Sequence, residues 1–564
     1  IQIRDDEIGE ATVKITINNK EIETEKGKTI LDAAREAGID IPTLCYIDGL
    51  VPSGACRMCL VEVEGFPKLV TSCSTEAQEG MKVKTHSPRV IEARKTIIEL
   101  LLANHPDDCL YCDMNGNCDL QKLAQEYGIR ERVYAAKKNS YELDLSSPSI
   151  VRDQSKCILC GKCVRVCEEI QNVSAIDFAN RGASTVVAPE FKDALGCSTC
   201  INCGQCTIVC PTGALTEKNY IIEVLNAIND PDKVVVVQHA PAISVTVGEC
   251  FDLEPETDYT GVLNTALRQA GFDVVFDTSF TADLTIMEEA SELVHRIQNN
   301  GVLPMMTSCS PGWIKFIEQF YPELIPNLST CKSPQQMMGA VIKHYYAPKM
   351  NIDPKKIYSV SIMPCTAKKF EAQREEMAEN DMPDIDAVLT TRELVKLLNM
   401  LKIDLKTLEP EEADDPLGER TSAGKLFGAT GGVMEAAIRT AYFMVTGKDL
   451  EDPVISSVRE LDGVKETTVD INGLKLNFAV VSGIGNVRKV LENLNKYHFI
   501  EVMTCPGGCI SGGGQPLGVN IDKVKSRMRT LYKIDEKAPI RYSHKNESVQ
   551  KLYEEFLEKP LGEK

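Results

Sequence analysis

Two cysteine runs decide how the middle of this chain folds: CILCGKCVRVC at residues 157–167 and CINCGQCTIVCP at residues 200–211. Both have the spacing C-x2-C-x2-C-x3-C, and the second begins 43 residues after the first (157 to 200). Cysteines spaced this tightly bring several thiolates to one point, which suits a metal centre better than pairing with each other. The two runs therefore predict an internal repeat built around metal.

The spacing of this repeat is typical of bacterial ferredoxins that hold two [4Fe–4S] clusters. In such proteins the fourth cysteine of each run binds the cluster of the other run. Pro211, which closes the second run, fits the same pattern. We therefore predict two [4Fe–4S] clusters with the ligands Cys157, Cys160, Cys163, Cys167, Cys200, Cys203, Cys206 and Cys210.

The composition agrees with metal centres and argues against several other classes of protein. The chain has 564 residues and 22 cysteines, whereas disulfide frameworks belong to short secreted chains. Residues 1–10 are polar and acidic, unlike a secretory signal, so we expect a cytoplasmic protein. No apolar stretch approaches the length of a membrane span. The net charge of −20 argues against nucleic acid as a general partner, because phosphate binding needs a basic surface.

The first eighty residues predict a small α/β unit. Val13, Ile15 and Ile17 alternate with polar residues, a turn is expected at 18–19, and a helix is expected over 29–38. Four cysteines on the loops of such a ferredoxin-like sheet suit a [2Fe–2S] cluster, with the ligands Cys45, Cys56, Cys59 and Cys73. A zinc site with four cysteine ligands fits as well, because loop spacing does not identify the metal.

The next segment offers three cysteines and a histidine that could together hold a further cluster. A helix is expected over 90–104, and it leads to His105, Cys109, Cys112 and Cys118. Three cysteines leave a four-iron cluster one ligand short, and His105 lies four positions before Cys109. Spacing alone leaves a second interpretation open, in which His105 is an ordinary surface or core residue.

From about residue 233 the sequence changes to an α/β pattern. Apolar runs of strand length at 234–237, 274–276 and 478–481 alternate with helical segments such as 291–298 and 487–495. This alternation predicts α/β layers with largely parallel strands. In such sheets, ligand sites gather beyond the carboxyl ends of the strands.

Three cysteine motifs follow predicted strands in this region: TSCSPGW (307–313), MPCTAKKFE (363–371) and EVMTCPGGCISGGGQP (501–516). The glycines of the third allow the backbone to approach a bulky ligand closely, although a plain tight turn uses glycine as well. Together with the N-terminal cysteine patterns, the motifs resemble the [FeFe]-hydrogenases of the large form, which have four accessory clusters. The resemblance spans nearly the whole chain. It implies a multidomain α+β and α/β fold, in which ferredoxin-like modules precede a two-lobed α/β catalytic domain.

The resemblance also implies four domains. We expect a plant-ferredoxin-like [2Fe–2S] domain at 11–88, a [4Fe–4S] domain with one histidine and three cysteine ligands at 89–145, a two-cluster ferredoxin domain at 146–222 and a catalytic domain at 233–564. The second of these resembles the electron-input domains of hydrogenases and respiratory complexes, which favours His105 as a ligand. The implied cofactors are one [2Fe–2S] cluster, three [4Fe–4S] clusters and the H-cluster of the catalytic domain.

Individual residues match positions of the family's active site. By resemblance, Cys365, Cys505 and Cys509 hold the four-iron half of the H-cluster, and Cys509 bridges to a two-iron half that carries CO, cyanide and an azadithiolate. Lys368 resembles the lysine that hydrogen-bonds a cyanide. The other residues implied to contact the cofactor are Met363, Met503, Pro241, Gln335 and Phe427. The implied proton relay runs through Cys309, Glu289, Ser329 and Glu292. Without the resemblance, the carboxylates of 288–292, expected at the start of a helix, would be taken for surface charges.

One position departs from the family's pattern. The usual signature has two adjacent cysteines before the proline, the first for protons and the second as a cluster ligand, whereas this chain has Cys309 followed by Ser310. Three possibilities remain for the fourth ligand. Ser310 binds iron through oxygen, Cys309 becomes the ligand and leaves the proton path, or Cys331 reaches in.

The expected reaction is 2 H+ + 2 e− ⇌ H2. A thiol such as Cys309 suits a proton relay because its pKa can be tuned toward neutral. Several accessory clusters imply an external one-electron partner, most simply ferredoxin, and the two-iron cofactor must be delivered by maturation proteins. The alternatives are the catalytic subunit of an NADH-linked hydrogenase, a hydrogen sensor and a non-catalytic iron–sulfur protein. The chain lacks a G-x-G-x-x-G fingerprint, so an NADH site would belong to a partner subunit. The chain is expected to act as a monomer or as a subunit of a larger complex.

Overall fold

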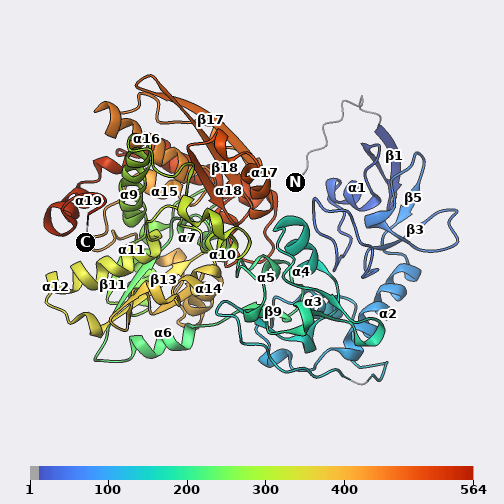
Figure 1. Cartoon of the computed structure of the whole chain (residues 1–564). Coiled ribbons are helices and arrows are strands. Elements are labelled where there is room, and N and C mark those ends of the chain that lie inside the picture. Colours follow the sequence, from blue (N-terminus) through green and yellow to red (C-terminus); the bar gives the residue numbers. More distant parts are fainter. Residues whose placement is uncertain (1–11, 137, 563–564) are drawn as a thin grey trace.

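The computed structural model of the chain describes residues 12–136 and 138–562. The acidic start at 1–10 and residue 11, where the first domain is predicted to begin, lie outside the described residues. Figure 1 shows the N-terminal sheet at one end, two α/β lobes at the other, and the segment with helices α3 to α5 between them. No helix of the described ranges is long and apolar enough to cross a membrane.

The N-terminal part folds as the alternating pattern predicted. Its five strands take the order β2-β1-β5-β3-β4, and β1 pairs antiparallel with β2 across the turn at Asn18 and Asn19. Helix α1 (Ile30–Glu36) begins after Thr29, whose side chain forms a reciprocal capping box with Asp32. The strands are β1 (Thr12–Ile17), β2 (Lys20–Glu25), β3 (Leu60–Val63), β4 (Val70–Thr71) and β5 (Lys82–Lys84).

Two helices and a small repeat connect this sheet to the rest of the chain. Helix α2 (Pro88–Asn104) confirms the helix predicted over 90–104, and α3 (Asp119–Glu126) follows the next three cysteines. Each run of the cysteine repeat then enters a short helix, α4 (Lys162–Arg165) or α5 (Gln205–Val209). Two antiparallel strand pairs frame the repeat: β6 (Ile150–Arg152) with β9 (Leu215–Glu217), and β7 (Asp177–Ala179) with β8 (Val186–Ala188).

The first lobe is built on a four-stranded parallel sheet with the order β11-β10-β13-β16. Every residue of β11 is buried, and β13 is buried at all positions but one, as expected for a parallel sheet covered on both faces. The strands are β10 (Val234–His239), β11 (Val274–Asp277), β13 (Ile357–Met363) and β16 (Ala387–Thr390). The helices are α6 (Ile221–Ile228), α7 (Pro241–Ser244), α8 (Thr260–Gln269), α11 (Pro334–Val341), α12 (Ala347–Lys349), α13 (Ala367–Glu371) and α14 (Thr391–Met400).

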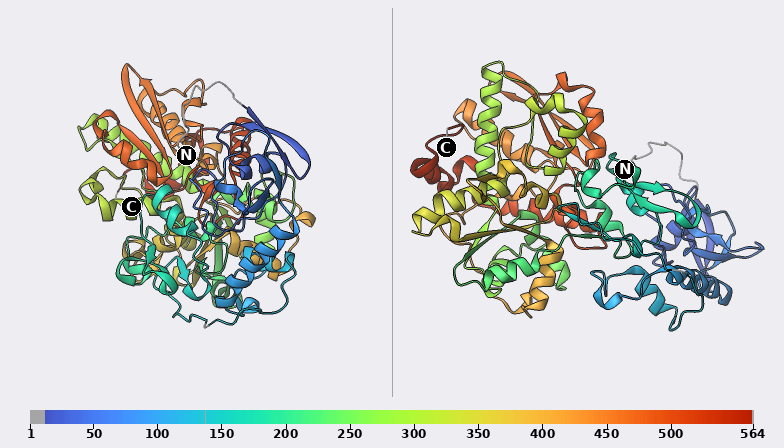
Figure 2. Two further views of the ribbon diagram at one scale, coloured as in Figure 1. Left: turned by 90° about the vertical axis from the view of Figure 1, so that its right-hand side faces the viewer. Right: turned by 60° about the horizontal axis from the view of Figure 1, so that its bottom comes forward.

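The second lobe contains the sheet β12-β19-β18-β17, which is parallel except for its last strand. The strands are β12 (Met305–Met306), β17 (Val464–Ile471), β18 (Leu474–Ser482) and β19 (Phe499–Met503). Its helices are α9 (Ser279–Gln298), α10 (Pro311–Phe320), α15 (Ser422–Leu426), α16 (Gly432–Thr446), α17 (Val487–Leu491) and α18 (Ile521–Lys537). Helix α19 (Glu547–Leu552) packs instead in the core that contains Val236 and Phe276 of the first sheet. A two-residue hairpin, β14 (Ala378–Glu379) and β15 (Met382–Pro383), lies apart from both sheets. Figure 2 shows the two lobes from two further sides.

Helix α9 corrects one prediction from the sequence. It begins at Ser279, twelve residues before the predicted 291 (291 − 279), so Glu288–Glu292 lies in the middle of the helix. Its first eight residues, 279–286, are all buried, and the one charged residue among them, Asp283, is buried as well. Glu289 and Glu292 are 0% and 6% exposed, so they are not surface charges.

Close backbone contacts fix the second ferredoxin run against the catalytic domain. A Cβ atom built on Gly513 would lie 2.0 Å from the carbonyl oxygen of Cys203, and one on Gly204 would lie 2.3 Å from Oγ1 of Thr366. The Thr366 hydroxyl donates to the carbonyl oxygen of Asn202 at 2.7 Å. The glycines of the third motif therefore serve close packing of one loop on another.

We predict that Gly513→Ala lowers stability much more than Gly447→Ala. The first Cβ meets the backbone of Cys203, which cannot rotate away, and overpacking of this kind costs about 3 kcal/mol. Gly447 follows the end of α16 at a φ of +67°, and no atom lies within 4 Å of the position of an added Cβ. Alanine there would lower the stability only through the left-handed backbone conformation, by about 1 kcal/mol. Melting temperatures of the two variants under anaerobic conditions test the difference. An equal decrease in melting temperature in both variants would show that the Gly513 loop has room for a side chain beside Cys203.

Candidate active site

The three cysteine motifs converge on one cavity between the two lobes. Strand β13 ends at Met363 and leads to Cys365, and β19 ends at Met503 and leads to Cys505. Both cysteines line the cavity, together with Cys309 after β12, so the site lies at the carboxyl ends of parallel strands, as the sequence predicted. The space between the lining atoms is about 860 Å³.

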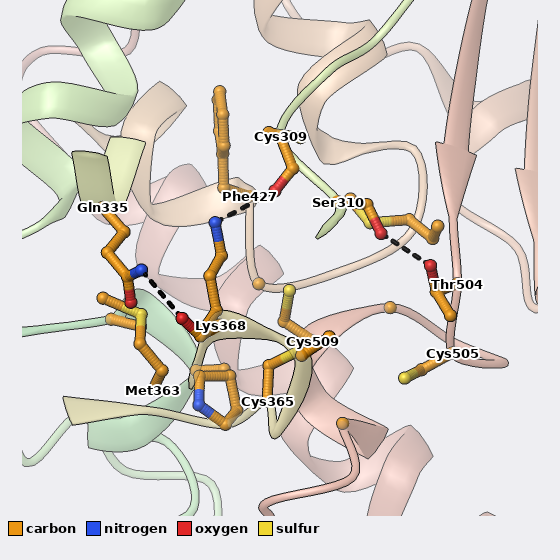
Figure 3. A pocket seen from close by; sticks show the side chains of 18 of the residues that line it. Cys309, Ser310, Gln335, Met363, Cys365, Lys368, Phe427, Thr504, Cys505 and Cys509 are labelled. Carbon is orange, nitrogen blue, oxygen red and sulfur yellow. Dashed lines mark hydrogen bonds between the residues drawn. The ribbon is translucent and has the colours of Figure 1, made fainter. Parts of the chain in front are cut away.

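The residues around the cavity fit an iron–sulfur cofactor. Cys365, Cys505 and Cys509 all line it and come from two separate loops. Figure 3 shows the three cysteines with Lys368 beside them, the only labelled cation in that view. Most of the remaining lining is apolar, and it includes four residues that the sequence assigned to the cofactor: Pro241, Met363, Phe427 and Met503. Soft thiolate ligands in an apolar wall are the donor set that iron–sulfur clusters use.

Lys368 is held at the cavity by a buried network. Its Nζ donates to the Glu371 carboxylate at 2.9 Å, to the Ser333 hydroxyl at 2.8 Å and to the carbonyl oxygen of Cys309 at 3.1 Å. The Gln335 amide also donates to Glu371, at 3.0 Å, and to the carbonyl oxygen of Lys368 at 3.3 Å. The ammonium group is thereby fixed as a donor at the cavity wall.

The three candidates for the fourth ligand take different positions. Cys309 and Ser310 both line the cavity. The Ser310 hydroxyl shares a hydrogen bond of 2.7 Å with the Thr504 hydroxyl, next to Cys505 (Figure 3). Cys331 does not contribute to the lining; its carbonyl oxygen accepts from the Ser308 hydroxyl at 2.6 Å and its amide donates to Ser329 at 3.3 Å.

A buried acid lies on the Cys309 side of the cavity. Burial raises the pKa of the Glu289 carboxyl to about 8; the Ser308 amide lowers the pKa and the charge of Glu292 raises it. Among the described residues, no donor lies within hydrogen-bonding distance and geometry of either carboxylate oxygen, although the Ser308 amide and the Ser329 hydroxyl lie near enough to lower the pKa. Burial also raises the pKa of the Cys309 thiol well above its usual value, and Glu289 raises it further. The expectation that this thiol is tuned toward neutral pH is therefore wrong, because desolvation outweighs the opposing effect of Lys368.

From this acid, hydrogen-bonded groups continue toward the surface. The Ser329 hydroxyl donates to the Glu292 carboxylate at 3.0 Å, and Arg296 pairs with the same carboxylate at 2.6 Å. Arg296 also donates to the carbonyl oxygen of Leu328 at 2.8 Å, which fixes the arginine side chain beside the backbone just before Ser329. The structure thus brings all four residues of the predicted relay to one side of the cavity.

The cysteine repeat lines two further small cavities. Their linings cross over between the runs, as the spacing predicted. The first is lined by Cys157, Cys160, Cys163 and Cys210, and the second by Cys167, Cys200, Cys203 and Cys206. Cys203 lines both the second of these cavities and the active-site cavity.

Known families match the same segments. The C-terminal domain of the iron-only hydrogenase large subunit matches 233–513, and the iron hydrogenase small subunit matches 521–564. Further matches are a 2Fe-2S cluster-binding domain at 10–88, the iron–sulfur binding region of NADH-ubiquinone oxidoreductase G at 94–132 and a 4Fe-4S dicluster domain at 156–220. The domain borders given above stay predictions.

Similar proteins cover nearly the whole chain. NADP-reducing hydrogenase subunit HndD of Solidesulfovibrio fructosivorans is 48% identical over 98% of this chain and 97% of its own length. Iron hydrogenase 1 of Clostridium pasteurianum is 44% identical over 97% of each. The chain belongs to the iron-only hydrogenase family. A solved variant of apo [FeFe]-hydrogenase HydA1 from Chlamydomonas reinhardtii is 41% identical, with a TM-score of 0.56 over 61% of this chain and 96% of that one.

The predicted family and fold class are thereby confirmed, and the protein is a hydrogenase with [2Fe–2S] and [4Fe–4S] cluster-binding domains. In the first of these domains, Cys59 and Cys73 are both buried with their sulfurs 3.3 Å apart, and the Cys56 amide lies 3.5 Å from the sulfur of Cys45. The four predicted [2Fe–2S] ligands therefore form two adjacent pairs. Within the described ranges, no three His, Cys, Asp or Glu side chains meet closely enough to hold a single metal ion.

The next segment of the hydrogenase places its candidate ligands around one short loop. His105 directly follows α2 and is 9% exposed, and Cys118 is the residue before α3. Cys109 is exposed, whereas Cys112 lies against Gly213, where an added Cβ would come within 2.6 Å of its sulfur. The four-residue ligand set with His105 stays a prediction.

Sequence reasoning missed several residues that hold the site together. Glu371 and Ser333 anchor Lys368, and Thr504 contacts Ser310. Glu501, fully buried, accepts from the amides of Gly431 and Met434 at 2.6 and 2.7 Å, which fixes the start of α16 against β19. Glu371, Thr504 and Glu501 lie inside the quoted motifs, so charged or polar residues within those motifs were the available signal.

We predict that Glu289→Gln becomes more stable relative to the wild type as the pH rises. The folded-state pKa of about 8 lies above the ordinary value of 4.5, so the native state holds the extra proton between these values. The stability that this proton provides is complete below pH 4.5 and is lost as the pH rises through 8. Glutamine stays neutral, so the difference grows by on the order of 4 kcal/mol across this range.

Denaturant unfolding of both proteins at about pH 5 and about pH 9 measures this difference. Glu492→Gln, which changes an exposed carboxyl, is the control and shows no comparable trend. A constant difference between wild type and Glu289→Gln would mean that Glu289 is ionised in the folded protein throughout.

Proposed function

We propose that this hydrogenase catalyses 2 H+ + 2 e− ⇌ H2 at the cavity between the lobes, with an H-cluster held by Cys365, Cys505 and Cys509. The observation that carries this proposal is the convergence of these three cysteines and Lys368 on one buried, mainly apolar cavity. When bound, the H-cluster with its CO, cyanide and azadithiolate ligands supplies the iron chemistry that joins electrons and protons. The chain supplies position, protons, electrons and exclusion of water.

Lys368 is suited to hold an anionic ligand of the cofactor. Its ammonium group is a compact charge held by Glu371 and Ser333, and a bound anion would take the donor that now reaches the Cys309 carbonyl oxygen, the longest of the three bonds at 3.1 Å. Met363, Met503, Phe427 and Pro241 form the apolar wall that keeps water from the site. Gln335 lies behind Lys368 and fixes its backbone.

Protons reach the site through Cys309, Glu289, Ser329 and Glu292. Cys309 and Glu289 are both neutral acids at pH 7, because burial raises the pKa of each. A neutral thiol and a neutral carboxyl each carry a proton to pass on, and each is restored from its outer neighbour. Ser329 and Glu292 share a hydrogen bond, and the Arg296 side chain is 11% exposed beside them, so the outer end of this series reaches the protein surface.

Electrons reach the site through the ferredoxin repeat. Cys203 lines the cavity of one [4Fe–4S] cluster and the active-site cavity as well, so its loop connects the two directly. Two [4Fe–4S] clusters in the repeat, one at His105 and a [2Fe–2S] cluster at Cys45, Cys56, Cys59 and Cys73 complete the set. A series of this kind serves an external one-electron carrier, and ferredoxin is the simplest.

A second candidate is a catalytic subunit of a nicotinamide-linked hydrogenase complex. The similarity to a relative described as an NADP-reducing hydrogenase subunit supports it. The same chain would then receive its electrons from a partner subunit that binds the nucleotide. Activity of the isolated chain with ferredoxin but not with NADH or NADPH fits either candidate, and restoration of nucleotide activity by a co-purified subunit would favour the second.

We predict that the matured protein evolves H2 from reduced methyl viologen and that Cys309→Ala lowers this rate at least about 100-fold, because a positioned proton donor is lost. Cys197→Ala, which removes an exposed cysteine outside every cavity described above, is the control and keeps the wild-type rate. Gas chromatography of the headspace measures H2. Infrared bands of bound CO and cyanide in Cys309→Ala show that the cofactor is still in place. Full activity of Cys309→Ala would remove this residue from the proton path.

A further inference from the structure

The active-site cavity offers three cysteines where a four-iron cluster takes four ligands. Cys365, Cys505 and Cys509 line the cavity without a partner cluster elsewhere, whereas Cys203 is shared with the four-cysteine cavity of the ferredoxin repeat. The cavity wall therefore has to provide one further donor atom. Cys309 and Ser310 are the residues of the lining that bring a thiol or a hydroxyl from the loop after β12.

Ser310 holds its hydroxyl in an unusual direction. It is the residue before α10, a ten-residue helix with Pro311 at its first position, and serine at this place normally caps the helix with its side chain. Here the side chain makes no capping bond. The hydroxyl instead meets Thr504 at 2.7 Å, across to the loop that carries Cys505 (Figure 3).

The surroundings of Ser310 favour a negative ligand at this point. The start of α10 carries the positive end of the helix dipole, and the backbone there is close to Thr504, since a Cβ on Gly312 would lie 2.9 Å from its side chain. Thr504 has a hydroxyl that can donate to an oxygen anion on Ser310. A deprotonated Ser310 oxygen would therefore be stabilised by the Thr504 hydroxyl and by the positive end of the α10 dipole.

The other two candidates face a different part of the site. The carbonyl oxygen of Cys309 accepts a hydrogen bond from the Lys368 ammonium at 3.1 Å, which ties the backbone of this residue to Lys368. Cys331 does not line the cavity, and its backbone is bonded to Ser308 and Ser329 on the relay side. Among the described residues, Ser310 is the candidate whose side chain is hydrogen-bonded to the loop that carries Cys505.

We infer that Ser310 is the fourth protein ligand of the active-site four-iron cluster, bound through its side-chain oxygen, with Thr504 donating a hydrogen bond to that oxygen. This inference rests on the proposed function of the cavity as a cluster site. Ligation replaces the O–H bond by an Fe–O bond and releases the proton to solvent, as thiols do when they bind metal. Oxygen is a harder donor than sulfur and stabilises ferric iron, so the cluster has a lower potential than its all-cysteine counterpart.

The test uses the full chain, reconstituted anaerobically with 57Fe and sulfide but without the two-iron cofactor. Mössbauer and EPR difference spectra between the wild type and each variant cancel the accessory clusters, which all proteins share. The variants are Ser310→Ala and Ser310→Cys, with Cys309→Ala and Cys331→Ala as matched controls. Each is then oxidised mildly and its iron at this site is counted.

We expect one oxygen-ligated iron in the wild type, which becomes sulfur-ligated in Ser310→Cys, with the cluster potential shifted upward. Ser310→Ala loses one of the four irons on oxidation and gives a three-iron signal, whereas both cysteine controls keep four. Iron loss in Cys309→Ala or Cys331→Ala with an unchanged Ser310→Ala spectrum would overturn the inference. An absent cluster in the wild type, with intact accessory clusters, would instead contradict the proposed function of the cavity.

Discussion

The contact between Gly513 and the Cys203 loop is the constraint on which the rest of the molecule depends. The absence of a side chain at Gly513 lets a catalytic loop lie directly on the backbone of a ferredoxin loop, and Gly204 does the same against Thr366. Arg392 strengthens the junction by pairing with Glu217 at 2.8 Å and by donating to the carbonyl oxygen of Gly513 at 2.9 Å. The electron-carrying part and the chemical part are thereby fixed at one separation, with Cys203 on the border of both cavities.

Charge is arranged differently on the two sides of the active-site cavity. On one side Lys368 and Glu371 form a buried ion pair whose hydrogen bonds are shared with Ser333 and Gln335, so both charges are compensated. On the other side Glu289 has no charged partner of opposite sign among the described residues, and its raised pKa keeps it neutral. The two sides therefore differ in kind: one holds a compensated ion pair and the other a neutral acid.

The sequence was sufficient for features that depend on local spacing. The crossing of Cys167 and Cys210 between the two ferredoxin cavities follows from the C-x2-C-x2-C-x3-C pattern, and the active-site loops follow from strands that end in cysteine motifs. Features that depend on tertiary burial could not be predicted from the sequence. The mid-helix position of Glu289, the partner of Lys368 and the contact of Ser310 with Thr504 arise from segments far apart in the chain. The pKa of Cys309 was misjudged for the same reason, since only the fold shows how far the thiol is removed from water.

The central claim is that the cavity between the lobes holds an H-cluster that reacts with H2. Infrared spectroscopy of the anaerobically matured wild-type protein tests it most directly, because bound CO and cyanide absorb where protein does not. The account predicts a set of CO and cyanide bands that shift when argon is replaced by H2 and return when H2 is removed. Iron–sulfur clusters at full occupancy without such bands, or bands that never respond to H2, would contradict it.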